Sequence, residues 1–230
     1  SNNCLMNLKI IKNYYHFISI LIIGIVLRFY YSGLESYWFD EQIAFYVSDP
    51  RLTFEESFLR SYSTDRSPFL FNFLLKNWFM LFGYSPDIGR YFSVFSGILS
   101  IFVFAYLSFI ISKKKPLFLV IFLSSFNIFL ISYSAETRAY STVFLFSLVN
   151  ICFFFEVFLS KKKNILFLFL FSFFSVIALL SHPFTILILI SELMFLSIYD
   201  FRNKKITYIN YFIFFAIFAT YLIIEHNYFI

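Results

Sequence analysis

Two adjacent carboxylates, Asp40 and Glu41, are the residues of this chain best suited to acid–base chemistry. They follow the aromatic run Tyr37-Trp38-Phe39 just beyond the first long apolar stretch, and only 13 of the 230 residues are acidic. A carboxylate at the water–lipid boundary can take a proton from an attacking hydroxyl or bind a metal ion, and partial desolvation strengthens it as a base. The alternative interpretation is structural: Asp40 caps a helix that runs to about Ser48, and Glu41 occupies its first turn.

A second candidate site lies in the tight turn of the sequence Tyr133-Ser134-Ala135-Glu136-Thr137-Arg138-Ala139-Tyr140. The arginine of this turn offers a planar fork suited to a phosphate, and the flanking tyrosines are typical of interfacial depth. His182, which precedes Pro183, is a third candidate at the end of another apolar stretch. The structural alternatives are that Glu136 and Arg138 anchor the turn at headgroup level and that His182 is a hydrogen-bonded packing residue.

The composition indicates the surroundings in which these groups work. The chain is 60% hydrophobic, 25% aromatic and 13% charged, with a mean hydropathy of +0.80. A soluble domain needs a more polar exterior, so we expect an integral membrane protein with several spans. The net charge of +5 comes from short lysine tracts between apolar stretches, which orient a membrane protein rather than bind nucleic acid.

A helix needs about 20 residues to cross the bilayer core, and by this length the sequence predicts seven spans. They cover about 14–31, 91–112, 116–133, 140–159, 164–181, 184–200 and 206–224. The stretch 67–83 is short and carries Asn72, Lys76 and Asn77, so we interpret it as an interfacial or re-entrant helix. The basic tracts then fall on the cytoplasmic side, as the positive-inside rule requires.

This topology places residues 32–90 in a first outer loop that contains surface helices. Thr53 and Glu56 form a predicted capping box, after which Phe54, Phe58 and Tyr62 line one face of a short amphipathic helix. Pro68 is expected to open the next helix. We expect the 230 residues to form a single membrane domain and to be the N-terminal portion of a longer protein, because the sequence stops just after a span.

Two ionisable residues fall inside the predicted spans. Glu192 lies at mid-membrane depth, where an acid either couples to protons or bonds to other polar groups, here Asn127 and Asn150, and fixes the packing. We favour packing. Arg28 is close to the outer end of the first span, and we expect it to extend outward to the headgroups.

The order of these motifs resembles that of the GT-C glycosyltransferases, which include protein O-mannosyltransferases and aminoarabinose–lipid A transferases. The resemblance covers most of residues 14–190. It is carried by the Asp-Glu pair behind aromatics and by four further elements, namely Ser67-Pro68-Phe69-Leu70 with Leu81-Phe82-Gly83, then Arg90, Ser93 and Gly97, then the turn from Tyr133 to Tyr140, and Ser181-His182-Pro183-Phe184. Arg66 and Ser67 depart from the family, which has His and Pro at these two positions.

The resemblance implies an all-helical GT-C membrane bundle and an inverting sugar transfer on the periplasmic face of a bacterial inner membrane. The donor is a polyprenyl-phosphate sugar, and the acceptor is a hydroxyl of a lipid, a glycan or a protein. Asp40 would take the acceptor's proton, with Glu41 orienting it, and Arg138 would stabilise the departing lipid phosphate. Glu136, His182, Arg66 and Tyr140 would bind substrates.

A divalent metal, Mg²⁺ or Mn²⁺, would be held by Asp40 and Glu136 if the enzyme uses one. Two other classes of function stay open from the sequence. One is a transporter or flippase for a lipid-linked or anionic substrate, in which Glu192 and Arg28 would be the working residues. The other is a purely structural membrane subunit.

Overall fold

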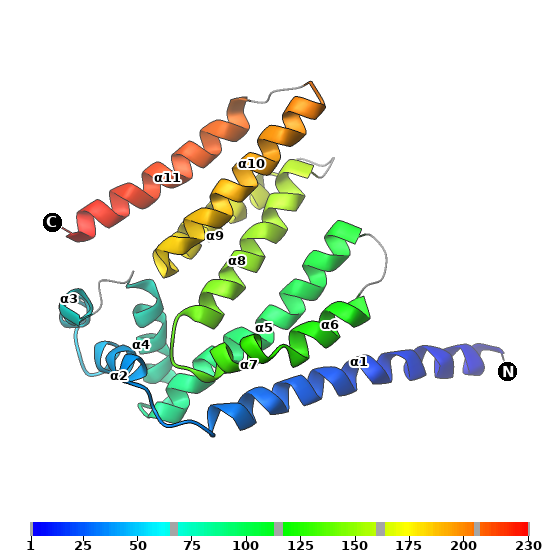
Figure 1. Cartoon of the computed structure of the whole chain (residues 1–230), viewed down its shortest axis with the longest axis horizontal. Coiled ribbons are helices and arrows are strands. Elements are labelled where there is room, and N and C mark those ends of the chain that lie inside the picture. Colours follow the sequence, from blue (N-terminus) through cyan, green and yellow to red (C-terminus); the bar gives the residue numbers. More distant parts are fainter. Residues whose placement is uncertain (1, 65–68, 113–116, 160–163, 205–207, 230) are drawn as a thin grey trace.

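The computed structural model describes residues 2–64, 69–112, 117–159, 164–204 and 208–229, and every regular element in this part of the chain is helical. The elements, shown in Figure 1, are α1 (Asn2–Ser32), α2 (Phe39–Val47), α3 (Phe54–Thr64), α4 (Leu70–Phe82), α5 (Pro86–Ser112), α6 (Leu117–Phe126), α7 (Ile128–Ala135), α8 (Tyr140–Phe154), the π-helix η1 (Phe155–Leu159), α9 (Ile165–Ser181), the 3₁₀-helix η2 (Pro183–Thr185), α10 (Ile186–Arg202) and α11 (Tyr208–Phe229).

The long helices form a bundle, and the short helices α2, α3 and α4 gather at one end of it (Figure 1). Helix α5 packs against α8, α8 against α9, and α9 against α11, while α1 packs against α6 and α7. The C-terminal ends of α5 and α10 point away from the three short helices (Figure 1). The loop helices and the turn between α7 and α8 therefore share one end of the molecule.

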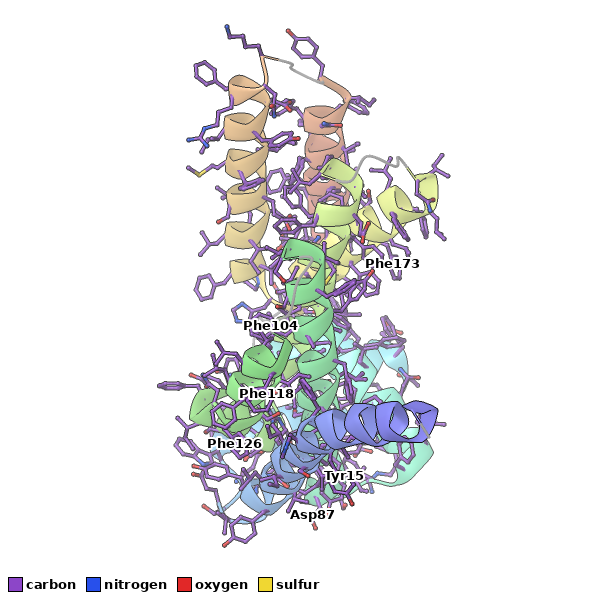
Figure 2. The ribbon with its side chains drawn as sticks, turned by 90° about the vertical axis from the view of Figure 1, so that its right-hand side faces the viewer. Tyr15, Asp87, Phe104, Phe118, Phe126 and Phe173 are labelled. Carbon is purple, nitrogen blue, oxygen red and sulfur yellow. The ribbon has the colours of Figure 1, made fainter. Side chains whose placement is uncertain are left out.

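Five of the described helices are long and apolar enough to cross a membrane, and the bent pair α6 and α7 makes up to six. Helix α9, with 17 residues, falls among the shorter apolar helices, so the predicted count of seven is not confirmed. Large apolar side chains cover the outside of the bundle. Phe118 and Phe173, for example, are each 47% exposed (Figure 2). The chain is thus a multi-pass helical membrane protein, as its composition predicts.

The predicted span 116–133 is broken at Asn127, where α6 and α7 meet at a bend of 51°. Asn127 has an extended backbone, and its side chain accepts a hydrogen bond of 3.1 Å from the Leu130 N–H, so it caps α7. The break leaves the last carbonyls of α6 without helical donors. Arg28 donates to the carbonyls of Ser124 and Ser125, at 2.8 and 3.2 Å.

The prediction that Arg28 extends outward is therefore wrong, because its side chain is only 1% exposed and forms the C-terminal cap of α6. A guanidinium placed against a helix C-terminus also meets the negative end of the helix dipole. Carbonyl groups without a hydrogen-bond donor in apolar surroundings cost free energy. Arg28 supplies donors to the carbonyls of Ser124 and Ser125 at the break.

Helix α3 begins with the predicted capping box, which the structure confirms. The Thr53 N–H donates to Glu56 at 2.7 Å, and the Thr53 hydroxyl accepts from the Glu56 N–H at 3.2 Å. The face turned inward is not the aromatic one, however. Ser57 and Ser61 are buried, whereas Phe54 and Tyr62 are exposed.

The polar residues that interrupt stretch 67–83 explain this packing. Lys76 on α4 donates to the Ser57 hydroxyl at 2.8 Å and to the carbonyls of Leu52 and Thr53 at 2.5 and 2.9 Å. Helix α4 thus turns its lysine toward α3 and the loop before it, and its 13 residues lie among the short helices (Figure 1). The expected helix start at Pro68 lies outside the described residues, and the described helix begins at Leu70.

Small residues on α5 allow α7 and the following turn to approach closely. A Cβ added to Gly97 would overlap the Ser134 hydroxyl oxygen and lie 2.9 Å from the Ser134 Cβ. We expect Gly97→Ala to lower the free energy of unfolding in detergent by about 1–3 kcal/mol, because packed backbone would have to shift. The matched control is Gly33→Ala, which would meet only the Tyr30 carbonyl oxygen at 3.7 Å. Equal stability of the two variants would contradict the packing, and Ser134→Gly should rescue Gly97→Ala.

Candidate functional site

The buried ion pair between Glu41 and Arg90 is the centre of the site. Glu41 is 1% exposed, and its two carboxylate oxygens lie 3.0 and 2.7 Å from Nε and Nη2 of Arg90 on α5. Helix α2 begins at Phe39, and the Trp38 N–H donates to Glu41 at 3.0 Å. Asp40 is therefore the second residue of the helix and not its cap, because Glu41 reaches back to the first free N–H.

Arg90 uses its whole donor set to fix the loop that follows α1. Besides Glu41, it donates to the carbonyls of Ser32, Glu35 and Ser36 at 2.7, 2.8 and 3.1 Å. Five N–H donors thus meet five acceptors, which is the full capacity of a guanidinium. The loop between α1 and α2 is consequently shaped around one arginine of α5.

Glu41 also holds the turn between α7 and α8. Its Oε1 accepts a hydrogen bond of 2.7 Å from the Thr137 N–H, and the Tyr37 hydroxyl donates to the Thr137 side chain at 3.0 Å. Burial alone would raise the pKa of Glu41, but the hydrogen bonds from Arg90, Thr137 and Trp38 outweigh it and hold that pKa below its usual value. Glu41 is therefore an ionised anchor that joins three segments.

Asp40 and Arg138 meet next to this anchor, at the surface. Asp40 Oδ2 lies 3.5 Å from Arg138 Nη2, and the side chains are 59% and 23% exposed. The same guanidinium reaches the Asp40 carbonyl through Nη1 at 3.5 Å and lies 5.6 Å from the centre of the Tyr140 ring. An exposed ion pair of this length contributes little to stability. This ion pair can therefore open when a ligand arrives.

Glu136 is the half-buried acid of the same turn. Burial raises its pKa, the charges of Glu41 and Glu35 raise it further, and those of Arg138 and Arg90 oppose the change. Tyr140 begins α8, and its ring lies 5.0 Å from that of Tyr133. The turn thus presents an acid, a guanidinium and two phenols on one short stretch.

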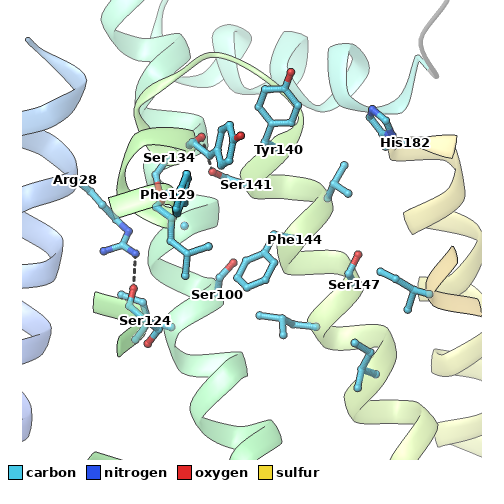
Figure 3. Close-up of a pocket in the computed structure, with 18 of the residues that line it drawn as sticks. Arg28, Ser100, Ser124, Phe129, Ser134, Tyr140, Ser141, Phe144, Ser147 and His182 are labelled. Carbon is cyan, nitrogen blue, oxygen red and sulfur yellow. Dashed lines mark hydrogen bonds between the residues drawn. The ribbon is translucent and has the colours of Figure 1, made fainter. Parts of the chain in front are cut away.

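A cavity of about 660 Å³ opens between α5, α7, α8 and η2, and Figure 3 shows its lining. Tyr140 and His182 lie on its two sides at one end, and Arg28 lies at the α1 side (Figure 3). Most other lining groups are apolar or small, among them Phe129, Phe144, Leu148, Ile188, Ser100 and Ser147. An elongated apolar ligand with a polar head is the kind of molecule that such a cavity suits.

The structure brings together most of the residues that the sequence singles out. Asp40, Glu41, Glu136, Arg138 and Tyr140 meet around the turn between α7 and α8. His182 caps η2 by accepting a hydrogen bond of 3.3 Å from the Phe184 N–H, and it shares the lining of the cavity with Tyr140. Asp40 and Glu41 are not among the residues that line the cavity.

Two expectations from the sequence, the role of Arg66 and the metal site, are not supported by a described contact. Arg66 lies outside the described residues. Asp40 and Glu136, named as metal ligands, do not join a third acid, histidine or cysteine, since the described residues contain no such group of three or more.

Arg90 and Thr137 are the site residues that sequence reasoning missed. The sequence offers Arg90 only as part of the family resemblance, and nothing identifies Glu41 as its partner 49 residues away. One sequence pattern could have pointed to this contact. The small residues Gly89, Ser93 and Gly97 are spaced four apart, and they mark the face of α5 that packs against the turn between α7 and α8.

The raised pKa of Glu136 predicts a pH-dependent stability. A carboxyl whose pKa is higher in the folded state favours folding when protonated, and this contribution is lost as the pH rises through the folded pKa. Glu136→Gln should therefore raise the unfolding temperature slightly at pH 7, and the gain should shrink toward pH 4. Thermal unfolding across this range checks the sign, with the exposed Glu55→Gln as control. A variant less stable than the wild type at pH 7 would contradict it.

No protein-family model, curated protein or solved structure matches this chain.

Proposed function

We propose that the protein is a membrane glycosyltransferase of the GT-C type. It moves a sugar from a polyprenyl-phosphate donor to a hydroxyl of a lipid, a glycan or a protein, with inversion at the anomeric carbon. The single observation that carries this proposal is the ion pair of Asp40 and Arg138, which is exposed while the Glu41–Arg90 pair beneath it is buried. A base and an anion-binding group are thus presented together next to Tyr140, which lines the apolar cavity.

The chemistry assigns each charged group a task. Asp40 accepts the proton of the acceptor hydroxyl, whose oxygen attacks the anomeric carbon. The bond between that carbon and the phosphate oxygen breaks, and the lipid phosphate leaves with the bonding electrons. Arg138, which is only 3.5 Å from Asp40, moves to the phosphate and stabilises the developing charge. This exchange of partners also frees Asp40 to act as a base.

The remaining residues support these two. Glu41 is a positioning residue in this proposal, because Arg90, Thr137 and Trp38 occupy its carboxylate. Glu136 and Tyr140 would contact the sugar from the turn. His182 would contact the substrate from the same end of the cavity as Tyr140. If a divalent metal is used, Asp40 and Glu136 are the residues that would hold it.

The proposed site faces the periplasm or exterior of a bacterial inner membrane, which makes an orientation prediction. In a variant without Cys4 and Cys152, a cysteine at exposed Ser36 should react with a membrane-impermeant thiol reagent from outside. A cysteine at exposed Asn203 should react only after the cells are opened. Equal labelling of both from outside would mean that α4 crosses the membrane and would overturn the orientation.

The function itself is tested by mass spectrometry of surface glycolipids and glycoproteins from cells with and without the protein. Loss of one sugar-sized mass from one acceptor, together with a rise in the lipid-linked sugar, would support transfer. No change in any acceptor and an unchanged lipid-linked pool would overturn it.

A second candidate, a transporter or flippase for a lipid-linked or anionic substrate, is favoured by Arg28. This guanidinium lines the cavity, its Nε has no hydrogen-bond partner among the described residues, and neither of the carbonyls of α6 that it caps carries a charge. A transporter would still move the lipid across reconstituted vesicles after Asp40→Asn, and an Arg28→Gln variant would not. The transferase proposal predicts the loss of product with Asp40→Asn.

A further inference from the structure

Glu192 is the acid that the proposed transfer does not use. It lies on α10, is buried, and is within the stretch Pro183–Arg202 that is long and apolar enough to cross a membrane. The two ends of the Asn150 amide lie between its carboxyl group and a serine of α9. One end is 2.9 and 3.2 Å from the two Glu192 oxygens, and the other is 2.6 Å from the Ser175 hydroxyl.

This chain of groups has two complete arrangements. When Glu192 is a neutral acid, its O–H donates to the Asn150 carbonyl, and the Asn150 NH₂ donates to Ser175. The Ser175 hydroxyl then donates to the Phe171 carbonyl, which it meets at 2.7 Å. The hydrogen bonds in the row from α10 through α8 to α9 then all run in one direction.

Ionisation of Glu192 reverses the row. The carboxylate then needs the NH₂ end of Asn150, as the distances of 2.9 and 3.2 Å permit. The carbonyl end of Asn150 turns to Ser175, whose single proton must leave Phe171 to meet it. An ionised Glu192 would thus have one amide donor and would deprive a backbone carbonyl of its side-chain donor.

The surroundings favour the neutral acid. The ionisable groups on the neighbouring elements are Tyr140 and Cys152 on α8, Glu156 on η1, His182 before η2, Tyr199, Asp200 and Arg202 on α10 itself, and Tyr208, Tyr211, Tyr221, Glu225 and His226 on α11. Among the described residues, no hydrogen bond or ion pair joins any of them to Glu192, and no cation does so. A lone carboxylate in an apolar membrane interior is costly without such a partner.

Glu192 also borders a cavity that adjoins the larger one. It lines a second cavity of about 370 Å³, and Ile151 and Ile188 belong to the lining of both this cavity and the larger one. Ile188 lies one helical turn before Glu192 on α10. The carboxyl group therefore lies next to the inner end of the space that opens beside His182.

We propose that Glu192 is an intramembrane proton-binding site, which exchanges its proton through the two adjoining cavities and reverses the Asn150–Ser175 hydrogen-bond row when it ionises. The site depends on neither Asp40 nor the sugar-transfer reaction. It gives α8, α9 and α10 two hydrogen-bonded states that differ by one proton.

The test is difference infrared spectroscopy of the full chain in lipid vesicles. At pH 7 the wild type should show the C=O stretching band of a protonated carboxyl that is absent in Glu192→Gln, whose amide replaces the acid O–H as donor. The control Glu55→Gln should leave this band unchanged. Identical spectra of the wild type and Glu192→Gln in this region at pH 7 would overturn the proposal. If Glu192→Gln does not fold, Glu192→Asp should shift the frequency of the band, and an unshifted band would overturn the proposal.

The row itself is tested by Asn150→Leu. Among the described residues, Asn150 supplies the donor to the ionised acid, and this variant removes it. Hydrogen bonds to charged groups are the stronger ones, so the midpoint at which the band disappears should rise by about one pH unit. An unchanged midpoint for the loss of the band would show that Asn150 does not bond to the ionised Glu192.

Discussion

Asp40→Asn is expected to lower the rate of sugar transfer by about 10²- to 10⁴-fold, the usual contribution of a general base. Asparagine keeps the size of the side chain and cannot accept a proton from the acceptor hydroxyl. The fold should be unaffected, because the Asp40 side chain is exposed and its ion pair with Arg138 is 3.5 Å long. The measurement is transfer from a synthetic polyprenyl-phosphate sugar by the purified protein, at matched amounts of folded protein.

The control for this variant is Glu55→Gln, which removes an exposed acid from the same loop. Arg138→Lys adds a second comparison, because lysine keeps the charge and loses the planar fork that suits a phosphate. We expect its loss of rate to be smaller than that of Asp40→Asn. Full activity of Asp40→Asn would remove the base from the mechanism.

Breaking the Glu41–Arg90 pair is expected to cost about 3–5 kcal/mol of unfolding free energy for either Glu41→Leu or Arg90→Met. Each variant leaves its partner as an unpaired buried charge. The double variant should cost less than the sum of the two. The double variant should still be less stable than the wild type, since the carbonyls of Ser32, Glu35 and Ser36 also lose their donor. Denaturant titrations in mixed micelles measure all three.

The pH dependence of this effect has a definite sign. The pKa of Glu41 is lowered in the folded protein, so its ionised form contributes stability above the unfolded pKa. That contribution is lost as the pH falls through the folded pKa. The stability difference between the wild type and Glu41→Gln should therefore narrow in acid, and a difference that widens there would contradict the burial of an ionised Glu41.

The sequence predicted the local features of the fold well, because they depend on near neighbours. The capping box of Thr53 and Glu56 and the interruption of stretch 67–83 by Lys76 are both read from residues within a few positions. The candidate carboxylates were also found, because acids are rare in this chain. Which of the two is buried depends on where α2 begins, and that is set by the Trp38 N–H bonding to Glu41.

Other features required contacts between distant segments. The partner of Glu41 is 49 residues away, and the carbonyls that Arg28 caps are 96 and 97 residues away. The break at Asn127 was hidden because the residues on both sides of it are together apolar enough to read as one span. Hydropathy reports how much of a helix is apolar and carries no information on where its backbone bends.

The cap on α6 has a consequence for how the protein is made. Translation proceeds at about 5–20 residues per second, so Arg28 emerges from the ribosome about 5–20 s before Ser124 and Ser125 exist. During that interval the Arg28 guanidinium lacks the two α6 carbonyls that it caps in the folded protein. Helix α1 can therefore reach its final position only after α6 has been made, about a hundred residues later.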